Sequence, residues 1–148
     1  MGFLTELRSR GTAADYQALV DRTPYARLLG LSIDSIDEGG RLLTRLRFDP
    51  SIVGNPNLPA IHGGVLGAFL EMAAIFQLMS EGEGDRVPKP INFTVEYLRS
   101  AGPRDAFAQA TITKLGRRVA NVSVRAWQDD SDRPVAAAHG HFLMPQGP

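Results

Sequence analysis

A single carboxylate, Glu71, lies inside an otherwise apolar segment, residues 61–76, which opens with His62, Gly63 and Gly64. An ionised carboxylate that is buried without partners loses much of its solvation free energy, so its presence indicates a polar ligand, a hydrogen-bonded partner or a catalytic role. The paired glycines would let a ligand approach the first N–H groups of a helix, which lack intrahelical partners and carry the positive end of the helix dipole. One element thus offers an electrophile-polarising end and a buried base.

Glu71 and His62 could each also have a purely structural role. An arginine or backbone amides would satisfy a buried Glu71 without any chemistry. We favour the functional interpretation because the Gly-Gly pair opens the helix at a fixed spacing from the acid. For His62 we favour helix capping or loop anchoring over a general-base role, because a side chain at a helix entry faces exposed backbone groups.

Composition limits what this helix can belong to. The 148 residues predict one compact domain with one core, and an apolar content of 43% is enough to fill it. The formal net charge of +0 argues against a nonspecific grip on nucleic acid, so any anion site must be local. Because cysteine is absent, disulfides, thiolate metal sites and a cysteine nucleophile are excluded.

Two segments bear on where the protein works. Residues 1–10 contain no uninterrupted apolar stretch of signal-peptide length. The apolar run at 65–79 is interrupted by Glu71 and Gln77 and is too short to span a bilayer. We therefore expect a soluble cytoplasmic protein with no membrane partner. Gln77 is expected at a subunit interface or on the one wet edge of the helix.

The hydrophobic periodicity predicts an α+β architecture. Short helices are expected at about 12–20 and at 24–29, with the apolar helix ending near residue 80. Residues 49–60, which contain three prolines, are expected to be a loop. The predicted strands lie at 31–36, 42–48, 91–98, 106–115, 118–128 and 135–144. Because the long helix is apolar nearly all round, an antiparallel sheet should wrap around it and a second subunit should cover the rest.

The order of these motifs resembles a known family. His-Gly-Gly followed by an acid nine positions after the histidine is similar to the PaaI-like (phenylacetic acid degradation) group of hotdog-fold acyl-CoA thioesterases, within the 4-hydroxybenzoyl-CoA thioesterase superfamily. The resemblance runs from about residue 31 to residue 144 and includes the strand at 92–101 and the turn at 114–118. It implies a hotdog domain at 31–148 preceded by an N-terminal helical segment at 1–30, in a single domain overall.

The resemblance also implies roles for residues. Glu71 would act as general base or nucleophile on a thioester carbonyl that the Gly63 N–H polarises. Coenzyme A is part of the substrate, and no further cofactor is implied. His139 and His141 are not spaced with a third ligand, so we expect no metal site and place both on one sheet face. The remaining substrate-binding candidates are His62, Gly64, Asn55, Asn57, Arg99, Lys114, Gly116, Arg117 and Arg118. For the basic residues, Arg104 included, the alternative is ordinary solvated charge at strand ends; taken together they favour binding of the coenzyme A phosphates.

Two positions depart from the family pattern. Relatives often carry an amide side chain six residues before the histidine, where this chain has Pro56 flanked by Asn55 and Asn57. A one-residue shift of the loop would restore an amide. Some relatives carry a hydroxyl one turn after the acid, where this chain has Ile75. The acyl pocket is therefore expected to be more apolar than in relatives that hydrolyse aromatic acyl thioesters.

Three function classes fit these residues. We prefer a thioesterase that hydrolyses an acyl-CoA or acyl-carrier-protein thioester. A hotdog hydratase or dehydratase would need a loop histidine about fourteen residues before the acid, and that position is Asn57. A noncatalytic acyl-CoA binding module would keep the cleft without turnover.

Helix geometry predicts that two subunits share the site. Gly63 and Glu71 are eight residues apart, so their backbones lie roughly 12 Å from each other along one helix. A base and an oxyanion donor must each lie about 3 Å from the reacting group. Two antiparallel helices across a two-fold axis would bring Gly63 of one subunit to Glu71 of the other. We therefore expect a homodimer, or a dimer of dimers.

Overall fold

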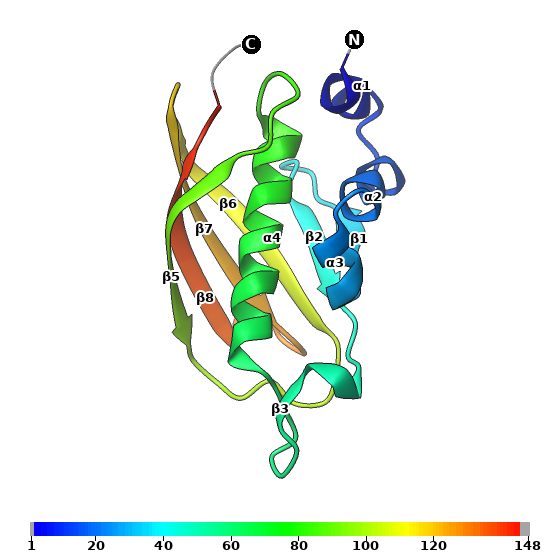
Figure 1. The fold of residues 1–148 in the computed structure, drawn as a ribbon, viewed down its shortest axis with the longest axis vertical. Coiled ribbons are helices and arrows are strands. Elements are labelled where there is room, and N and C mark those ends of the chain that lie inside the picture. Colours follow the sequence, from blue (N-terminus) through cyan, green and yellow to red (C-terminus); the bar gives the residue numbers. More distant parts are fainter. Residues whose placement is uncertain (1, 146–148) are drawn as a thin grey trace.

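The computed structural model describes residues 2–145 and contains a six-stranded antiparallel sheet that curves around one long helix (Figure 1). The strand order is β1-β2-β6-β7-β8-β5, so β5 and β1 are the two edges. The strands are β1 (Leu31–Ile36), β2 (Leu42–Leu46), β5 (Lys89–Tyr97), β6 (Ala106–Leu115), β7 (Val119–Trp127) and β8 (Ala136–Leu143). The helices are α1 (Phe3–Arg10), α2 (Ala13–Asp21), α3 (Pro24–Leu29) and α4 (Gly63–Glu81). The predicted α+β architecture is confirmed.

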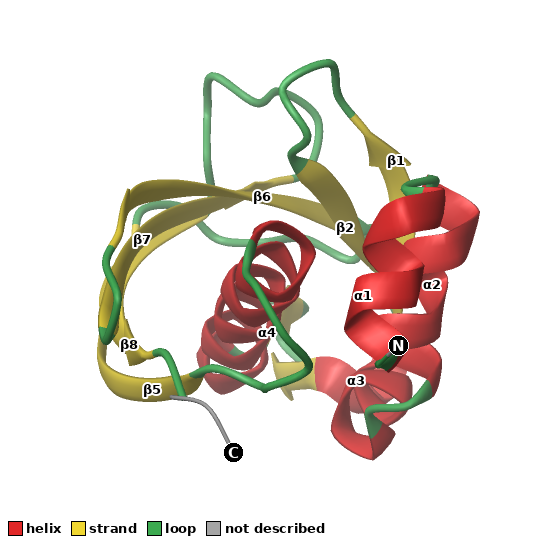
Figure 2. Cartoon of the chain, turned by 90° about the horizontal axis from the view of Figure 1, so that it is seen from above, coloured by secondary structure: helices red, strands yellow, loops and turns green. Residues whose placement is uncertain are grey.

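Small side chains on the sheet let α4 lie close against it. The strands alternate buried and exposed positions, and alanine fills many of the buried ones: Ala106, Ala108, Ala110, Ala120, Ala126, Ala136 and Ala138. The large side chains of α4, including Phe69, Leu70 and Phe76, are fully buried above them. Seen from above, α4 occupies the concave side of the sheet and the N-terminal helices stand beside it (Figure 2).

The length of α4 corrects the prediction that its apolar run is too short for a membrane. The helix extends beyond 65–79 at both ends, and by length and composition alone it could cross a bilayer. Core helices that pack inside a protein have the same length and composition. The contacts of α4 with β6, β7 and β2 account for its apolarity without a membrane.

Gln77 is placed differently from the prediction. It lies at neither a wet edge nor an open surface, because its side chain is only 1% exposed. Its amide oxygen accepts a hydrogen bond from Leu42 N–H at 2.8 Å, and its amide nitrogen donates to the Gly40 carbonyl at 3.0 Å. Gln77 thus joins α4 to the β1–β2 hairpin and satisfies backbone groups that the hairpin leaves unpaired.

Helix α1 adds to the N-terminal helical segment expected at 1–30, in which the predicted helices begin only at about residue 12. Two features of the sequence are typical of this helix: Leu4 and Leu7 are three residues apart, and Gly11 follows the last turn. In the structure both leucines are buried, and Gly11 ends the helix in the left-handed region at φ 69°. Asp85 accepts hydrogen bonds from the N–H groups at the start of the helix, including Leu4 N–H at 2.6 Å. Arg8 donates to the Met79 carbonyl at 2.9 Å, which fastens α1 to the end of α4.

The segment 49–60 contains more structure than the loop expected there. A 3₁₀ turn (η1, Pro50–Ile52) leads into a small hairpin of β3 (Val53–Asn55) and β4 (Ala60–Ile61). This hairpin projects beyond the N-terminal end of α4 (Figure 1). The predicted strands of the main sheet are confirmed within two residues at every end, and the largest differences are at the end of β2 and at the start of β5.

Candidate active site

The first turn of α4 leaves one backbone donor free. His62 is the N-cap residue: its Nδ1 accepts from Gly64 N–H at 2.8 Å, and its carbonyl accepts from Val65 N–H at 3.0 Å and Leu66 N–H at 3.2 Å. Of the four N–H groups that a helix start exposes, only Gly63 N–H has no acceptor among the described residues. It lies at the positive end of the α4 dipole, where a developing negative charge is stabilised.

The capping role predicted for His62 is therefore confirmed. Its Nδ1 serves as the acceptor in this cap. The ring also lies close to Gly54 of β3, where an added Cβ would approach its Cδ2 to 2.9 Å. The ring is thus held by the hairpin and by the helix.

The glycines at the helix start serve the packing of this chain. A Cβ on Gly64 would lie 2.9 Å from the His62 ring, and a Cβ on Gly63 would lie 3.2 Å from Cε1 of Tyr97. Gly67, one turn later, faces the same tyrosine, whose hydroxyl would lie 3.5 Å from an added Cβ. We expected these glycines to admit a ligand. The structure shows that the ring of Tyr97 already occupies the side of α4 that Gly63 and Gly67 leave bare.

Glu71 lies two turns further along α4, on a face that the sheet does not cover. Its side chain is half-buried, and burial raises the pKa of its carboxyl above the ordinary value for glutamate. No described residue donates a hydrogen bond to it. The structural interpretation of Glu71, in which an arginine or backbone amides satisfy it, is therefore not supported by residues 2–145. An unpaired carboxylate with a raised pKa suits proton abstraction or nucleophilic attack.

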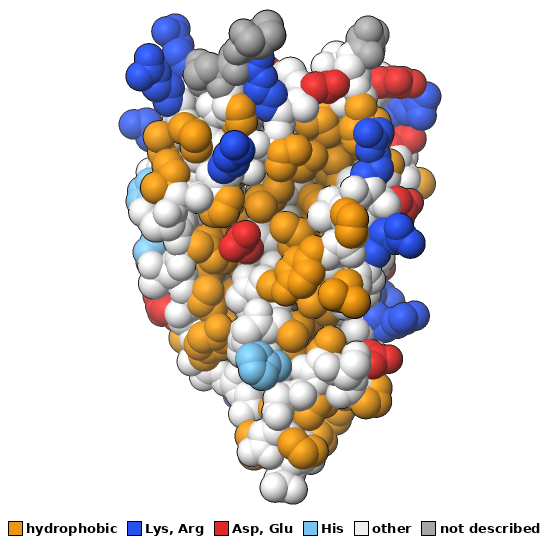
Figure 3. Space-filling view, in the orientation of Figure 1, with side chains coloured by type: hydrophobic (Ala, Val, Ile, Leu, Met, Phe, Trp, Pro, Cys, Tyr) orange, Lys and Arg blue, Asp and Glu red, His pale blue; other side chains and the backbone are white. Residues whose placement is uncertain are grey.

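The surface around this face is apolar. In Figure 3, hydrophobic side chains gather over the front of the molecule, on α4 and β5, while most of the charged side chains lie toward its margins. The partly exposed residues of α4 here include Val65, Ala68 and Met72. The site thus combines a free N–H, a desolvated carboxylate and an apolar surface.

The two asparagines named as substrate-binding candidates lie on the β3–β4 hairpin. Asn55 and Asn57 are both exposed, and Asn55 Oδ1 accepts from Asn57 N–H at 3.0 Å, which shapes the hairpin turn. The structure therefore gives Asn55 a local structural role next to the His62 end of the helix.

The basic candidates divide between opposite ends of the sheet. Arg99 follows β5 at the end where α4 begins, and it donates to the Pro134 carbonyl at 2.7 Å. Gly116, Arg117 and Arg118 form the β6–β7 turn at the end where α4 finishes, and Lys114 lies just before this turn, near the end of β6 (Figure 1). There, Gly116 and Arg117 line a hollow of about 760 Å³ with the residues that follow α4. Within one chain these residues do not form a single phosphate site.

Comparison with known proteins identifies the family. A family model of the thioesterase superfamily matches residues 58–135. A solved protein from Chromobacterium violaceum is 42% identical, with 99% of this chain and 98% of that chain covered and a TM-score of 0.77. The chain belongs to the thioesterase superfamily.

Two further solved structures relate the fold to thioesterase subgroups and ligands. A phenylacetic acid degradation-related protein from Ralstonia eutropha is 25% identical, covers 87% of this chain and 98% of its own, and has a TM-score of 0.75. A protein from Bacillus halodurans, solved with CoA, is 21% identical over 98% of this chain and 93% of its own, with a TM-score of 0.76. No curated protein matches this chain. The hotdog fold and the PaaI-like resemblance are confirmed.

One further residue of this thioesterase-superfamily member, Tyr97, contacts the start of α4, and the sequence did not identify it as part of the site. The Tyr97 hydroxyl donates to the Gly63 carbonyl at 2.8 Å. The only sequence signal for this contact is that Tyr97 alternates along its strand with Phe93 and Val95, so that the three side chains share one face of β5. That alternation cannot identify the contact, which joins residues 34 positions apart.

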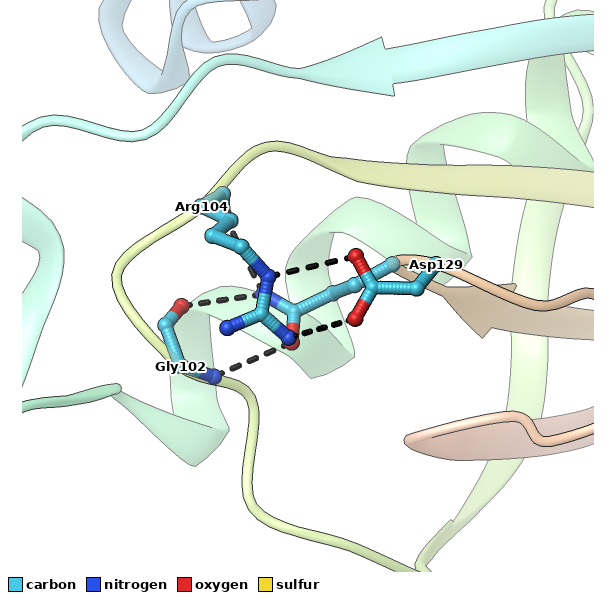
Figure 4. A network of polar contacts seen from close by, with 4 residues as sticks. Gly102, Arg104 and Asp129 are labelled. Carbon is cyan, nitrogen blue, oxygen red and sulfur yellow. Dashed lines mark hydrogen bonds and ion pairs between the residues drawn. The ribbon is translucent and has the colours of Figure 1, made fainter.

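Three further residues named in the sequence analysis, Arg104, His139 and His141, lie away from the start of α4 in this superfamily member. Arg104 pairs with Asp129, with Nη2 2.8 Å from Oδ2, and Gln128 completes the network by bonding both Gly102 and Arg104 (Figure 4). This network joins the loop before β6 to the turn after β7. His139 and His141 lie on the outer face of the sheet, as expected. Within residues 2–145, no three His, Cys, Asp or Glu side chains are grouped as a metal ion requires.

Proposed function

We propose that this protein hydrolyses an acyl-CoA thioester to the free acid and coenzyme A. The observation that carries the proposal is the pairing, on one helix, of the Gly63 N–H with the half-buried carboxylate of Glu71, neither of which has a hydrogen-bond partner in the part of the chain that the structure describes. Membership of the thioesterase superfamily and the CoA-bound relative support it.

The chemistry follows from these two groups. Glu71 removes a proton from a water molecule, whose oxygen attacks the thioester carbon, and Gly63 N–H donates to the oxyanion that forms. The carbon–sulfur bond then breaks, the thiolate of coenzyme A leaves and takes up a proton, and the acid remains. Direct attack by the carboxylate, through an anhydride that water then cleaves, uses the same two groups.

The site requires a second subunit. Gly63 and Glu71 of one chain are roughly 12 Å apart along α4, too far to act on one carbonyl. β5 is an edge strand with unpaired backbone groups on its outer side and exposed Ile91, Tyr97 and Leu98 at or next to it. Pairing of two β5 strands about a two-fold axis would bury these side chains and set the two α4 helices antiparallel.

The same arrangement would bring the basic β6–β7 turn of one subunit toward the Gly63 end of the other. Arginine forks and turn N–H groups there would bind the phosphates of coenzyme A. Changing both Arg117 and Arg118 to alanine should raise KM for CoA thioesters several-fold and lower kcat less, because phosphate contacts bind ground and transition states alike. Unchanged KM at low ionic strength would refute this assignment.

A substrate panel tests the proposed reaction. The protein is incubated with aromatic, short-chain and medium-chain CoA thioesters, and the released thiol is followed with a colorimetric thiol reagent. Thiol release with saturation kinetics supports the thioesterase. Binding of the esters without thiol release would instead support a noncatalytic module. Hydration of crotonyl-CoA would support a hydratase, although no described histidine lies in the loop position that such an enzyme uses.

Subunit mixing tests the shared site. Glu71→Ala protein and Gly63→Pro protein, each inactive, are allowed to exchange subunits. Random exchange rebuilds one intact site in each mixed dimer, so about a quarter of wild-type activity should return. Because a Cβ at Gly63 approaches the Tyr97 ring, circular dichroism must first show that the proline variant folds. Confirmed exchange without recovered activity would show that both groups act within one chain.

A further inference from the structure

The hydroxyl of Tyr97 contacts the helix start at the residue that carries the free N–H. Tyr97 is the last residue of β5, and its hydroxyl donates to the Gly63 carbonyl at 2.8 Å. Its ring lies against the bare sides of Gly63 and Gly67, since added Cβ atoms there would lie 3.2 Å and 3.5 Å from it. The ring and the hydroxyl therefore make separate contacts with the first turn of α4.

This contact is part of a chain of hydrogen bonds through one peptide group. The Gly63 carbonyl and the Gly64 N–H belong to the same peptide plane. The carbonyl accepts from Tyr97, and the N–H donates to Nδ1 of His62 at 2.8 Å. Such chains polarise each member, and both ends of this peptide are fixed by side chains outside the helix ladder.

Fixing that peptide matters because two consecutive glycines precede the rest of the helix. Glycine has the widest backbone freedom of any residue, and a helix start has fewer intrahelical bonds to restrain it. The Gly63 N–H has no acceptor among residues 2–145, so its direction depends on how firmly Gly63 is held on its other side. A donor must already point at the oxyanion to stabilise it fully.

We propose that Tyr97 is a positioning residue that holds Gly63 N–H in the direction needed to polarise a thioester carbonyl. The inference rests on the proposed function and deepens it. Tyr97 acts through the Gly63 peptide and takes no proton. Its hydroxyl fixes the carbonyl, and its ring excludes water from the side of the first turn that the glycines leave bare.

Tyr97→Phe separates positioning from packing because it keeps the ring and removes only the hydroxyl. Tyr25→Phe is the matched control, since Tyr25 is similarly exposed at 50% and lies on α3 with no hydrogen bond to the site. We expect Tyr97→Phe to lower kcat about tenfold with little change in KM or melting temperature, and Tyr25→Phe to change none of these. The split between kcat and KM distinguishes positioning from a structural role, which would lower the melting temperature.

A spectroscopic measurement tests the same point without turnover. In the Glu71→Gln background, the carbonyl stretch of a bound ¹³C-labelled acyl-CoA thioester reports how strongly the N–H polarises it. Its shift to lower frequency should be smaller when Tyr97→Phe is added and unchanged when Tyr25→Phe is added. Equal shifts and equal kcat in both tyrosine variants would overturn the inference. If the wild-type protein releases no thiol from any ester, the proposed function fails, and the carbonyl shift still decides the role of Tyr97.

Discussion

Two polar residues interrupt the apolar helix α4, and their surroundings differ completely. The Gln77 side chain is fully buried, with both ends of its amide bonded to the β1–β2 hairpin. The Glu71 side chain is half-buried, has no hydrogen-bond donor within the described chain, and has a raised pKa. The first arrangement is how a polar group stabilises a core, and the second is how a reactive group is kept available.

Helix geometry explains why Gln77 and Glu71 have different surroundings on the same helix. Six residues on an α-helix correspond to a rotation of about 120° between the two side chains. Gln77 therefore faces the hairpin while Glu71 faces the open side near β5. A polar residue in an apolar helix must therefore be interpreted by the face it occupies, since the surrounding sequence is equally apolar for both.

The largest expected effect is on catalysis at Glu71. Glu71→Gln keeps the size of the side chain and removes its charge, so kcat should fall by roughly 10²–10⁴ with little change in KM. Steady-state thiol release measures this. Glu81→Gln, an exposed position at the end of the same helix, is the matched control and should leave kcat unchanged. A folded Glu71→Gln protein with near wild-type kcat would remove Glu71 from the mechanism.

The next effect is on stability at Gln77. Gln77→Leu leaves the Leu42 N–H buried without an acceptor, so the free energy of unfolding should fall by roughly 1–3 kcal/mol. Urea unfolding measures the loss. Gln109→Leu is the control, because its amide makes one longer hydrogen bond, 3.3 Å to Asp37, on the outer sheet face. The folded fraction of Gln77→Leu should retain its kcat. If fully folded Gln77→Leu protein had a lower kcat, Gln77 would affect catalysis as well as stability, and its role would not differ from that of Glu71 in the way proposed.

The smallest effect is a pH-dependent stability change at Glu71. Because burial raises the pKa of this carboxyl in the folded state, ionisation costs stability as pH rises through that folded pKa. Glu71→Gln avoids the cost, so it should melt at a slightly higher temperature than wild type at neutral pH. The difference should vanish in acid, below the pKa of the unfolded chain, where Glu71 is protonated in both states. A Gln variant that is less stable at neutral pH would indicate a stabilising partner for the carboxylate.

The parts of the site that the sequence predicts are those that lie close together along the chain. The free donor and the carboxylate follow from the spacing of Gly63 and Glu71 on one helix, and the capping role of His62 follows from its place at the helix start. The main strands follow from alternation of apolar residues. The start of β5 was placed two residues late because Pro90 discourages a strand, although an edge strand tolerates proline.

The parts that the sequence misses depend on contacts between distant residues. Gln77 was misplaced because its partners lie 35 and 37 positions away on a hairpin. The bond from Tyr97 to Gly63 spans 34 positions, and the cap of α1 by Asp85 spans about 80. Local periodicity carries no information on such pairs. The sequence likewise does not show that Arg99 lies at the opposite end of the sheet from Arg117 and Arg118, because this depends on how the strands are arranged.

The open edge of β5 has a consequence for handling the protein. A lone protomer exposes a row of unpaired N–H and C=O groups along β5, next to exposed Ile91, Tyr97 and Leu98. Such an edge is a template for disordered self-association as well as for a correct pair. Dissociation of a pair would therefore uncover this edge in both protomers, and because irreversible precipitation requires exposed edges to meet, its rate rises with the concentration of lone protomers. Substitutions on β5 that block pairing of two protomers should therefore lower the solubility of the protein as well as its activity.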